Sequence, residues 1–442
     1  MESVLQFILG VAIIAVGVAL SIGLHEVGHL VPAKLFGIKV TQYMVGFGPT
    51  ILSRRRGETE YGLKAVPLGG YVAMVGMFPP RQEGDRPTAQ STGFFQSMIQ
   101  DARQQSAESV GDDLDRAFYR KPVWQRIIVM LGGPAMNFVL AIVFFAITVC
   151  VFGTVQSSTT VGSVSACVLP ATSQRQTCED GDTPAPGAAA GIKPGDRLVS
   201  MAGTPIDSWA QSTSIIQKSA GDAIPVVVER DGQQVSLSIT PLLTERYVYN
   251  DDGTIAKAAD GTELTQKVGF VGIGAAGQLV QQPVTAVFPL MGQTIGNTVN
   301  LVLNLPQRLV DVANAAFGSG ERDPNGPISV VGVGRVAGEI ATIDSIPLAS
   351  KAATFFGILG SLNIALGVIN LVPLTPLDGG HVAAAIWEAI KRGFARLRRK
   401  PDPGPVDAAK LMPLTFAVVI VFIGMSALLI YADIVKPINI LG

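Results

Sequence analysis

The start of the chain combines a membrane-spanning run with a metal-binding pattern. Residues 4–24 carry no charged side chain and are almost all apolar, and such a run is long enough to cross a bilayer. It ends in His25-Glu26-Val27-Gly28-His29, an H-E-x-x-H pattern. On a helix, residues four apart share one face, so both imidazoles can bind one Zn²⁺ while Glu26 takes a proton from water. Because ionisable groups in lipid are costly, we predict a functional zinc site rather than an incidental polar helix end.

The composition indicates an integral membrane protein with a soluble portion. Hydrophobic residues make up 48% of the chain and charged residues 15%, whereas soluble domains are about a quarter charged. The net charge of −1 suggests no nucleic-acid partner. The N-terminal run has an acidic residue, Glu2, where a signal peptide would be basic, and no small-residue cleavage site follows it. We therefore interpret it as a retained helix.

Four apolar runs predict four transmembrane helices, in residues 1–36, 127–153, 353–372 and 411–432. The uncharged stretch 268–307 could be a fifth span, but three prolines interrupt it. A fifth span would also move the basic cluster 391–400 outside, against the positive-inside rule. We therefore expect residues 275–350 to form an amphipathic region on the membrane surface.

The distribution of Lys and Arg predicts the orientation in the membrane. Residues 39–126 contain twelve basic side chains and residues 391–400 contain six, but the longer stretch 127–307 has only eight. Loops rich in Lys and Arg face the cytoplasm. The segment 158–274 is therefore expected outside the cytoplasm, and both chain ends fall on that side as well.

The two soluble segments differ in character. The cytoplasmic loop 37–126 begins with a Gly-punctuated β-hairpin pattern, followed at 79–115 by a polar stretch that predicts a flexible insertion. The outer segment 158–274 has the length of one small domain and alternating strands joined by Asp231-Gly232. Its two cysteines, Cys167 and Cys178, could form a disulfide outside the cytoplasm or remain thiols, and the sequence favours neither.

A third zinc ligand is required, because catalytic zinc normally has three protein ligands and one open position. Asp378, in the Leu-Asp-Gly motif 377–379, follows the third span at the membrane side where the first span also ends. We predict that Asp378 is this ligand. An Asp in a helix-terminal turn is the alternative interpretation, and His381 is a rival ligand expected nearer the aqueous loop.

The chain resembles a known family, the site-2 proteases, which are intramembrane zinc metalloproteases of the RseP type. It looks most like the single-PDZ actinobacterial members. The motifs that carry the resemblance, in this order, are His25 to His29, Val45-Gly46-Phe47-Gly48-Pro49, Pro67-Leu68-Gly69-Gly70-Tyr71-Val72, Ala117-Phe118, Gly133-Pro134-Ala135-Met136-Asn137-Phe138, Gly326-Pro327-Ile328-Ser329 and Asn370 through Gly379.

The resemblance implies roles for individual residues. Zinc would be held by His25, His29 and Asp378, and Glu26 would be the general base. Asn370 would lie near the substrate backbone. The hairpin from Gly46 to Tyr71 would dip into the membrane and present a strand to the substrate.

The outer segment 158–274 also resembles a known module, a PDZ domain, through Gly191-Ile192-Lys193-Pro194-Gly195-Asp196. Residues 167–187 insert near the usual ligand loop of that module, which favours a size filter over capture of a peptide carboxylate. The expected fold is therefore a polytopic α-helical membrane protein with about four transmembrane helices, a membrane-associated β-hairpin and one extracytoplasmic PDZ-like α+β domain.

The implied function is hydrolysis of a peptide bond within or near the transmembrane segment of single-pass membrane proteins. Anti-sigma factors already trimmed by a site-1-type protease are the expected substrates. The expected location is the bacterial inner or plasma membrane, with the active site near the cytoplasmic side. The alternatives are a catalytically inactive PDZ adaptor, against which the intact Glu26 argues, and an ion-coupled transporter, against which the lack of an inverted repeat argues.

Overall fold

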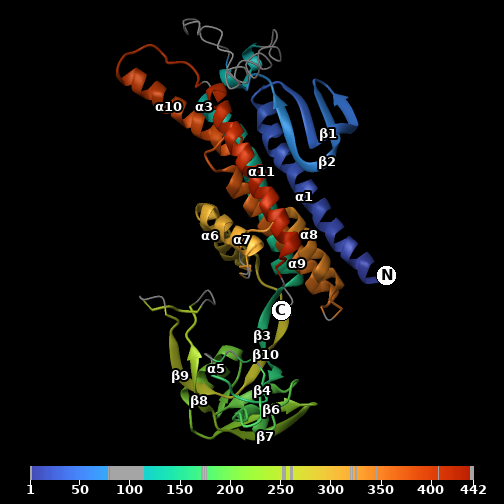
Figure 1. The fold of residues 1–442 in the computed structure, drawn as a ribbon, viewed down its shortest axis with the longest axis vertical. Helices are drawn as coiled ribbons and strands as arrows, with labels where there is room; N and C mark the ends of the chain where they lie inside the picture. The colour runs from blue at the N-terminus through green and yellow to red at the C-terminus, as the bar shows by residue number, and fades with distance from the viewer. Residues whose placement is uncertain are drawn as a thin grey trace. The chain divides into compact units, whose positions relative to one another are not determined.

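The computed structural model describes residues 2–77, 79, 114–170, 173, 175, 177–250, 255–258, 262–318, 320, 322–323, 326–344, 346–406 and 408–438. The chain divides into two compact units, one helical and one rich in β-strands (Figure 1). The helical unit contains Met1–Phe152 and Gln282–Gly442, and the β-rich unit contains Gly153–Gln281.

Four helices among the described residues are long and apolar enough to cross a membrane, and they coincide with the four predicted spans. Their spans are Glu2–Leu35 (α1), Val123–Phe152, Leu348–Asn370 (α9) and Met412–Val435 (α11). The second is an α-helix at Val123–Ala146 (α3) that continues as a π-helical stretch at Ile147–Phe152 (η3).

The crossing of α1 and α3 depends on two glycines that leave no room for a side chain. A Cβ atom on Gly28 would lie 2.2 Å from the carbonyl oxygen of Gly132, and a Cβ on Gly132 would lie 2.0 Å from that of Gly28. Small residues at such crossings let helix backbones approach closely in a membrane. The close approach brings α3 against the part of α1 that carries the H-E-x-x-H pattern.

The predicted hairpin is present as two long antiparallel strands, Val40–Arg56 (β1) and Thr59–Met74 (β2). Both strands bend, so residues 42–45 pair with 70–73 on one side and with 60–63 on the other. The described structure gives residues 70–73 a strand partner on one side only, which makes them an edge of this sheet. The base of the sheet packs on α1 and α3 through Val40, Tyr43 and Val72. Of the predicted flexible insertion, only residues 79, 114 and 115 are described.

Three helices occupy the region expected on the membrane surface, Val287–Leu303 (α6), Leu305–Phe317 (α7) and Val330–Thr342 (α8). They pack against the long helices. A Cβ on Gly10 of α1 would lie 2.5 Å from the carbonyl oxygen of Ala337 in α8. Val287 of α6 is fully buried in a cluster with side chains of α3 and α9. Their position relative to a bilayer stays a prediction.

The turn after α9 is tight, and two glycines allow it to fold back on helix Asp378–Leu397 (α10). A Cβ on Gly379 would lie 2.4 Å from the carbonyl oxygens of Leu371 and Val372. A Cβ on Gly380 would lie 2.5 Å from the amide nitrogen of Thr375. The two glycines of the Leu-Asp-Gly-Gly segment therefore let residues 371–375 pack against the start of α10, whose first residue is Asp378.

The β-rich unit is built on a six-stranded sheet with strand order β10-β3-β4-β6-β7 and β5 beside β4, and β8 pairs with β9. The unit begins before residue 158 and ends after residue 274, the predicted bounds, because the pairing of β3 with β10 extends beyond them. The strands are Thr154–Val164 (β3), Arg197–Met201 (β4), Thr204–Pro205 (β5), Ile224–Arg230 (β6), Gln233–Ile239 (β7), Leu242–Tyr247 (β8), Thr265–Phe270 (β9) and Ile273–Val280 (β10). The helices are Pro186–Ala189 (α4) and Trp209–Lys218 (α5).

Two contacts close the loops of this unit. Cys167 and Cys178 form a disulfide, one of the two states that the sequence left open. Asp196 is 1% exposed and accepts hydrogen bonds from Nε and Nη2 of Arg230, at 2.7 and 2.8 Å, and from the amide of Lys193. The Arg230 guanidinium holds the pKa of Asp196 below its usual range, more strongly than burial raises it.

Candidate metal centre

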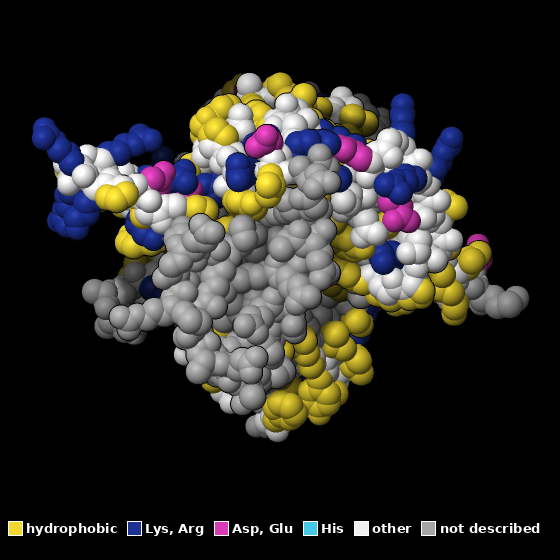
Figure 2. Space-filling model, turned by 90° about the horizontal axis from the view of Figure 1, so that it is seen from above, with side chains coloured by type: hydrophobic (Ala, Val, Ile, Leu, Met, Phe, Trp, Pro, Cys, Tyr) yellow, Lys and Arg dark blue, Asp and Glu magenta, His cyan; other side chains and the backbone are white. Residues whose placement is uncertain are grey.

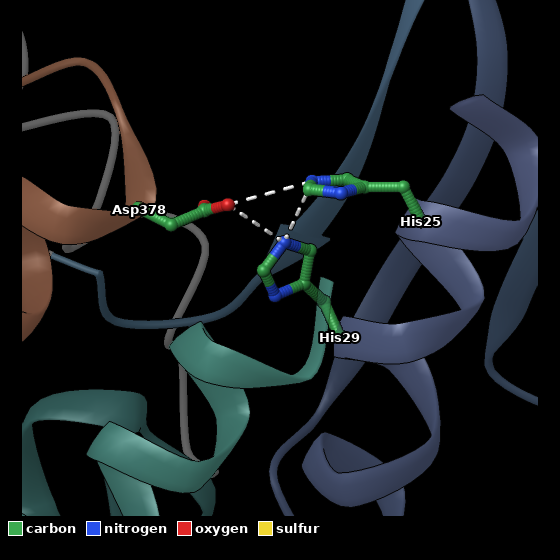
Figure 3. Close-up of side chains that lie close together, drawn as sticks. All are labelled: His25, His29 and Asp378. Carbon is green, nitrogen blue, oxygen red and sulfur yellow. Dashed lines mark hydrogen bonds and ion pairs between the residues drawn. The ribbon is translucent and has the colours of Figure 1, made fainter. Parts of the chain in front are cut away.

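The two histidines of the H-E-x-x-H pattern lie on one face of α1, as the helical spacing predicts (Figure 3). Both are buried, and their Nε2 atoms are 3.2 Å apart. Asp378 approaches them from α10, although it follows them by most of the length of the chain. Its Oδ2 atom lies 3.4 Å from Nε2 of His25 and 3.3 Å from Nε2 of His29.

These three distances fit a tetrahedral zinc ion. Zinc bonds to nitrogen and oxygen are about 2.0–2.1 Å long, so neighbouring ligands of a tetrahedral ion lie about 3.3–3.4 Å apart. Oδ2 of Asp378 is buried and, within the described residues, accepts no hydrogen bond. A buried carboxylate oxygen without a donor is costly unless a cation takes that place.

Gly133 of α3 lies directly beside the imidazoles of His25 and His29. A Cβ atom at this position would lie 2.2 Å from Nε2 of His29 and 2.7 Å from Nε2 of His25. Only glycine therefore leaves open the space next to these two Nε2 atoms. The donor set, the ligand spacing and this open space all fit zinc.

The second nitrogen of each imidazole contacts α3. Nδ1 of His29 lies 2.8 Å from the carbonyl oxygen of Val129, which can only accept a hydrogen bond. Nδ1 of His29 therefore carries the proton, and its Nε2 presents a lone pair to a metal. Nδ1 of His25 lies 3.1 Å from the amide group of Asn137, which is fully buried.

A cavity of about 430 Å³ opens over His25, His29 and Asp378. The other predicted site residues Glu26, Asn370 and Tyr71 line this cavity with them. His381 also lines it, but lies outside the cluster of ligand atoms formed by the other three residues. The roles of these residues stay predictions.

Gly46 is not among the residues that line the cavity. Its φ is +93°, and a Cβ there would lie 2.7 Å from the carbonyl oxygen of Val66. The structure thus gives Gly46 a place in the bend of the hairpin. The sheet edge at residues 69–72 lines the cavity instead.

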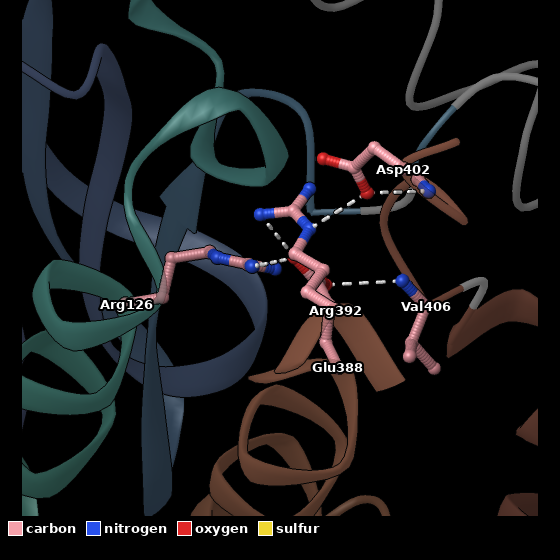
Figure 4. Close-up of polar contacts among 6 residues, drawn as sticks. Arg126, Glu388, Arg392, Asp402 and Val406 are labelled. Atoms are coloured by element: carbon pink, nitrogen blue, oxygen red, sulfur yellow. Dashed lines mark hydrogen bonds and ion pairs between the residues drawn. The ribbon is translucent and has the colours of Figure 1, made fainter. Parts of the chain in front are cut away.

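A buried ion pair connects α10 to α3 (Figure 4). Arg126 donates to Glu388, and their side chains are 7% and 1% exposed. Glu388 also accepts a hydrogen bond of 3.0 Å from the amide of Val406 and lies 3.1 Å from Arg392. Because α10 begins at Asp378, this anchor helps to hold the carboxylate beside the two histidines.

Sequence reasoning assigned no role to Asn137, Gly133 or the pair Arg126 and Glu388. A polar residue inside an apolar span is a candidate for function, and this signal could have found Asn137. Gly133 and the ion pair depend on which helices touch, and the sequence alone carries no signal for that.

Comparisons with known proteins agree with this site. The profile of Peptidase family M50 matches residues 13–401. Zinc metalloprotease Rip1 of Mycobacterium tuberculosis is 34% identical over 445 residues, covering 99% of this chain and 100% of the relative. Zinc metalloprotease Rip1 of Mycolicibacterium smegmatis is 32% identical over 447 residues, with the same coverage. Metalloprotease MmpA of Caulobacter vibrioides is 30% identical over 380 residues, covering 83% of each chain.

The four apolar helices and the family match define a multi-pass membrane protein that is a zinc metalloprotease. The chain belongs to peptidase family M50, the site-2 proteases, which act on membrane proteins within the bilayer. The resemblance, the enzyme class and the zinc cofactor predicted from the sequence are thereby confirmed.

Proposed function

We propose that this protease cleaves single-pass membrane proteins within or near their transmembrane segment, using zinc held by His25, His29 and Asp378. The observation that carries the proposal is the triangle of ligand atoms, with sides of 3.2, 3.3 and 3.4 Å, beside a glycine that leaves the metal position open. When bound there, zinc acts as a Lewis acid that polarises the scissile carbonyl and makes water a nucleophile near neutral pH.

Glu26 is proposed as the group that moves the proton. It follows His25 directly on α1, lines the same cavity and does not belong to the ligand cluster. Its carboxylate accepts a proton from the attacking water and then donates it to the nitrogen of the leaving amine. This transfer is the step that a Glu26→Gln variant would lack.

The edge of the hairpin sheet is the proposed binding place for the substrate backbone. A helical substrate must unwind first, because its carbonyls are hydrogen-bonded within the helix. An extended segment can then pair with residues 70–73, whose neighbour Glu26 is so close that a Cβ on Gly70 would lie 2.9 Å from its Cγ. Asn370 and Tyr71 line the cavity at this edge and are proposed to contact the substrate.

The substrates are proposed to be anti-sigma factors or similar single-pass proteins, trimmed outside by a site-1-type protease in a bacterial plasma membrane. The orientation is supported by the basic loops, which would place the zinc site near the cytoplasm. Figure 2 views the end of the helical unit where α10 and the hairpin lie, and Lys and Arg side chains project at its periphery.

The Cys167–Cys178 disulfide supports an oxidising location for the β-rich unit, which is proposed to be a PDZ-like size filter.

The test compares Glu26→Gln, Asp378→Ala and His381→Ala in membranes and in purified protein. Glu26→Gln should keep zinc and lose cleavage, and cells that express it should accumulate membrane-bound stubs that proteomics can identify. Asp378→Ala should lose both zinc and cleavage, whereas His381→Ala should retain most of its zinc. Cleavage by Glu26→Gln at the wild-type rate would disprove the general-base role. Loss of zinc in His381→Ala but not in Asp378→Ala would move the third ligand.

A further inference from the structure

The two zinc-binding histidines differ in what holds their second ring nitrogen. For His29 the partner is the backbone carbonyl of Val129, at 2.8 Å. For His25 the partner is the side-chain amide of Asn137, at 3.1 Å from Nδ1, and both side chains are buried. A backbone carbonyl fixes the tautomer of an imidazole by itself, whereas an amide group can donate or accept a hydrogen bond.

The amide orientation shown places Nδ2 of Asn137 against Nδ1 of His25. In that orientation Oδ1 of Asn137 is buried and has no hydrogen-bond partner among the described residues. It would also require His25 to carry its proton on Nε2, the atom that lies 3.4 Å from Asp378 and 3.2 Å from His29. A protonated Nε2 has no lone pair for a metal.

Rotating the amide by 180° removes the conflict at His25 and gives Oδ1 a donor, while Nδ2 takes the place that Oδ1 occupied. The oxygen and nitrogen of an asparagine amide exchange places in this rotation, with no change in the position of the side chain. Oδ1 then accepts a hydrogen bond from Nδ1–H of His25, and the lone pair of Nε2 points to the metal position. His25 then has the same tautomer that the Val129 carbonyl imposes on His29.

We propose that Asn137 is a positioning residue of the metal centre, whose Oδ1 accepts the Nδ1–H of His25 and fixes its orientation and tautomer for zinc. The inference rests on the ligand set given under the proposed function. It also assigns a role to α3, which supplies no ligand. Through Val129, Gly133 and Asn137, this helix orients both histidines and leaves the metal space open.

The test uses two substitutions that distinguish whether residue 137 accepts or donates the hydrogen bond to His25. Asn137→Asp keeps an acceptor oxygen and removes the donor, and Asn137→Leu removes both at similar volume. Zinc dissociation constants of the full-length purified proteins, measured by chelator competition, should stay within a few-fold of wild type for Asn137→Asp. Asn137→Leu should bind zinc about 10–100-fold more weakly, the usual effect of losing a partner of a metal-binding His.

Asn363 offers a matched control in α9. It is also fully buried, its Oδ1 also lacks a partner in the described part of the chain, and its Nδ2 donates to Ser21 of α1 at 2.9 Å. Asn363→Leu and Asn363→Asp therefore repeat the same changes in the same helix bundle, at a side chain that hydrogen-bonds to Ser21 and Leu359 instead of to a ligand. Both should leave the zinc dissociation constant within about threefold of wild type.

The outcomes are distinguishable. Equal zinc affinity in wild type and Asn137→Leu would overturn the inference, as would a large loss in Asn137→Asp, which would mean that the amide donates. An increase in KM for substrate without a change in zinc affinity would assign Asn137 to substrate binding instead. If Asn137→Leu does not fold, Asn137→Asp alone decides between the two orientations. Failure of the wild-type protein to bind zinc through His25, His29 and Asp378 would instead overturn the proposed function.

Discussion

Gly133 decides whether a metal ion fits between the two histidines. A methyl group at this position would lie 2.2 Å from Nε2 of His29 and 2.7 Å from Nε2 of His25. Its neighbour Gly132 serves a different purpose, the close crossing of α1 and α3. Adjacent glycines in one helix thus meet two separate requirements, one for packing and one for chemistry.

Gly133→Ala should reduce zinc occupancy at least tenfold, because its Cβ would occupy the space beside both Nε2 atoms. The measurement is the zinc content of protein purified without added metal, together with the dissociation constant. Gly357→Ala in α9 is the matched control, since a Cβ there would have no atom within 4 Å. Full zinc binding by Gly133→Ala would show that the histidines can move apart, and would weaken the assignment of this glycine.

At the scale of helices and strands, the sequence predicted those elements whose pattern is local. The four apolar runs and the hairpin, with its Gly-rich turns, were predictable because length and alternation suffice. The packing of α8 on α1 was not, since it depends on a long-range contact between Gly10 and Ala337. The approach of Asp378 is also a long-range contact, and it was predicted from membrane depth instead of from a local pattern. Asn137 received no role, although it was quoted within a motif.

The ion pair between Asp196 and Arg230 leads to a prediction about how strands β4 and β6 respond to acid. Because Arg230 lowers the pKa of folded Asp196, the unfolded chain binds more protons once the pH drops to about 4, the ordinary pKa of Asp. The stabilisation is therefore complete above about pH 4 and is lost as the pH falls through the lower pKa of the folded state. At pH 5, Asp196→Asn should cost about 2 kcal/mol, the usual scale for hydrogen bonds to charged groups.

Hydrogen exchange of β4 and β6 in the full-length protein, corrected for intrinsic rates, measures this effect at pH 5 and at pH 3. The difference between wild type and Asp196→Asn should shrink as the pH is lowered. The control is Asp222→Asn, because Asp222 is an exposed carboxylate of the same unit. A difference that stays constant with pH would mean that the ion pair does not titrate in this range.

At the scale of the whole molecule, the chain leaves the helical unit and returns to it through one paired ribbon. Thr154 lies opposite Val280 at the base of β3 and β10, so the β-rich unit begins and ends at one place. Its core is internal, with Leu198, Met201 and Val226 fully buried. The unit has the anatomy of an inserted domain, which needs nothing from its host to bury its apolar side chains.

The isolated fragment 153–281 should therefore fold cooperatively in an oxidising buffer. The shorter fragment 158–274, the range that the sequence pattern suggested, should be less stable because it loses the pairing of residues 154–157 with 277–280. Thermal unfolding followed by circular dichroism compares the two fragments. A non-cooperative transition in the longer fragment would show that this unit requires the membrane helices.

The origin of the zinc ligands has a consequence for the timing of biosynthesis. His25 and His29 leave the ribosome with the first helix, but Asp378 follows only after about 350 further residues. At ~5–20 residues per second this delay is about 20–70 s. Under the proposed ligand set, the nascent chain shares the membrane with other newly inserted proteins for all of that time without a complete metal centre. Under the same ligand set, a product truncated before Asp378 would also lack a complete metal centre.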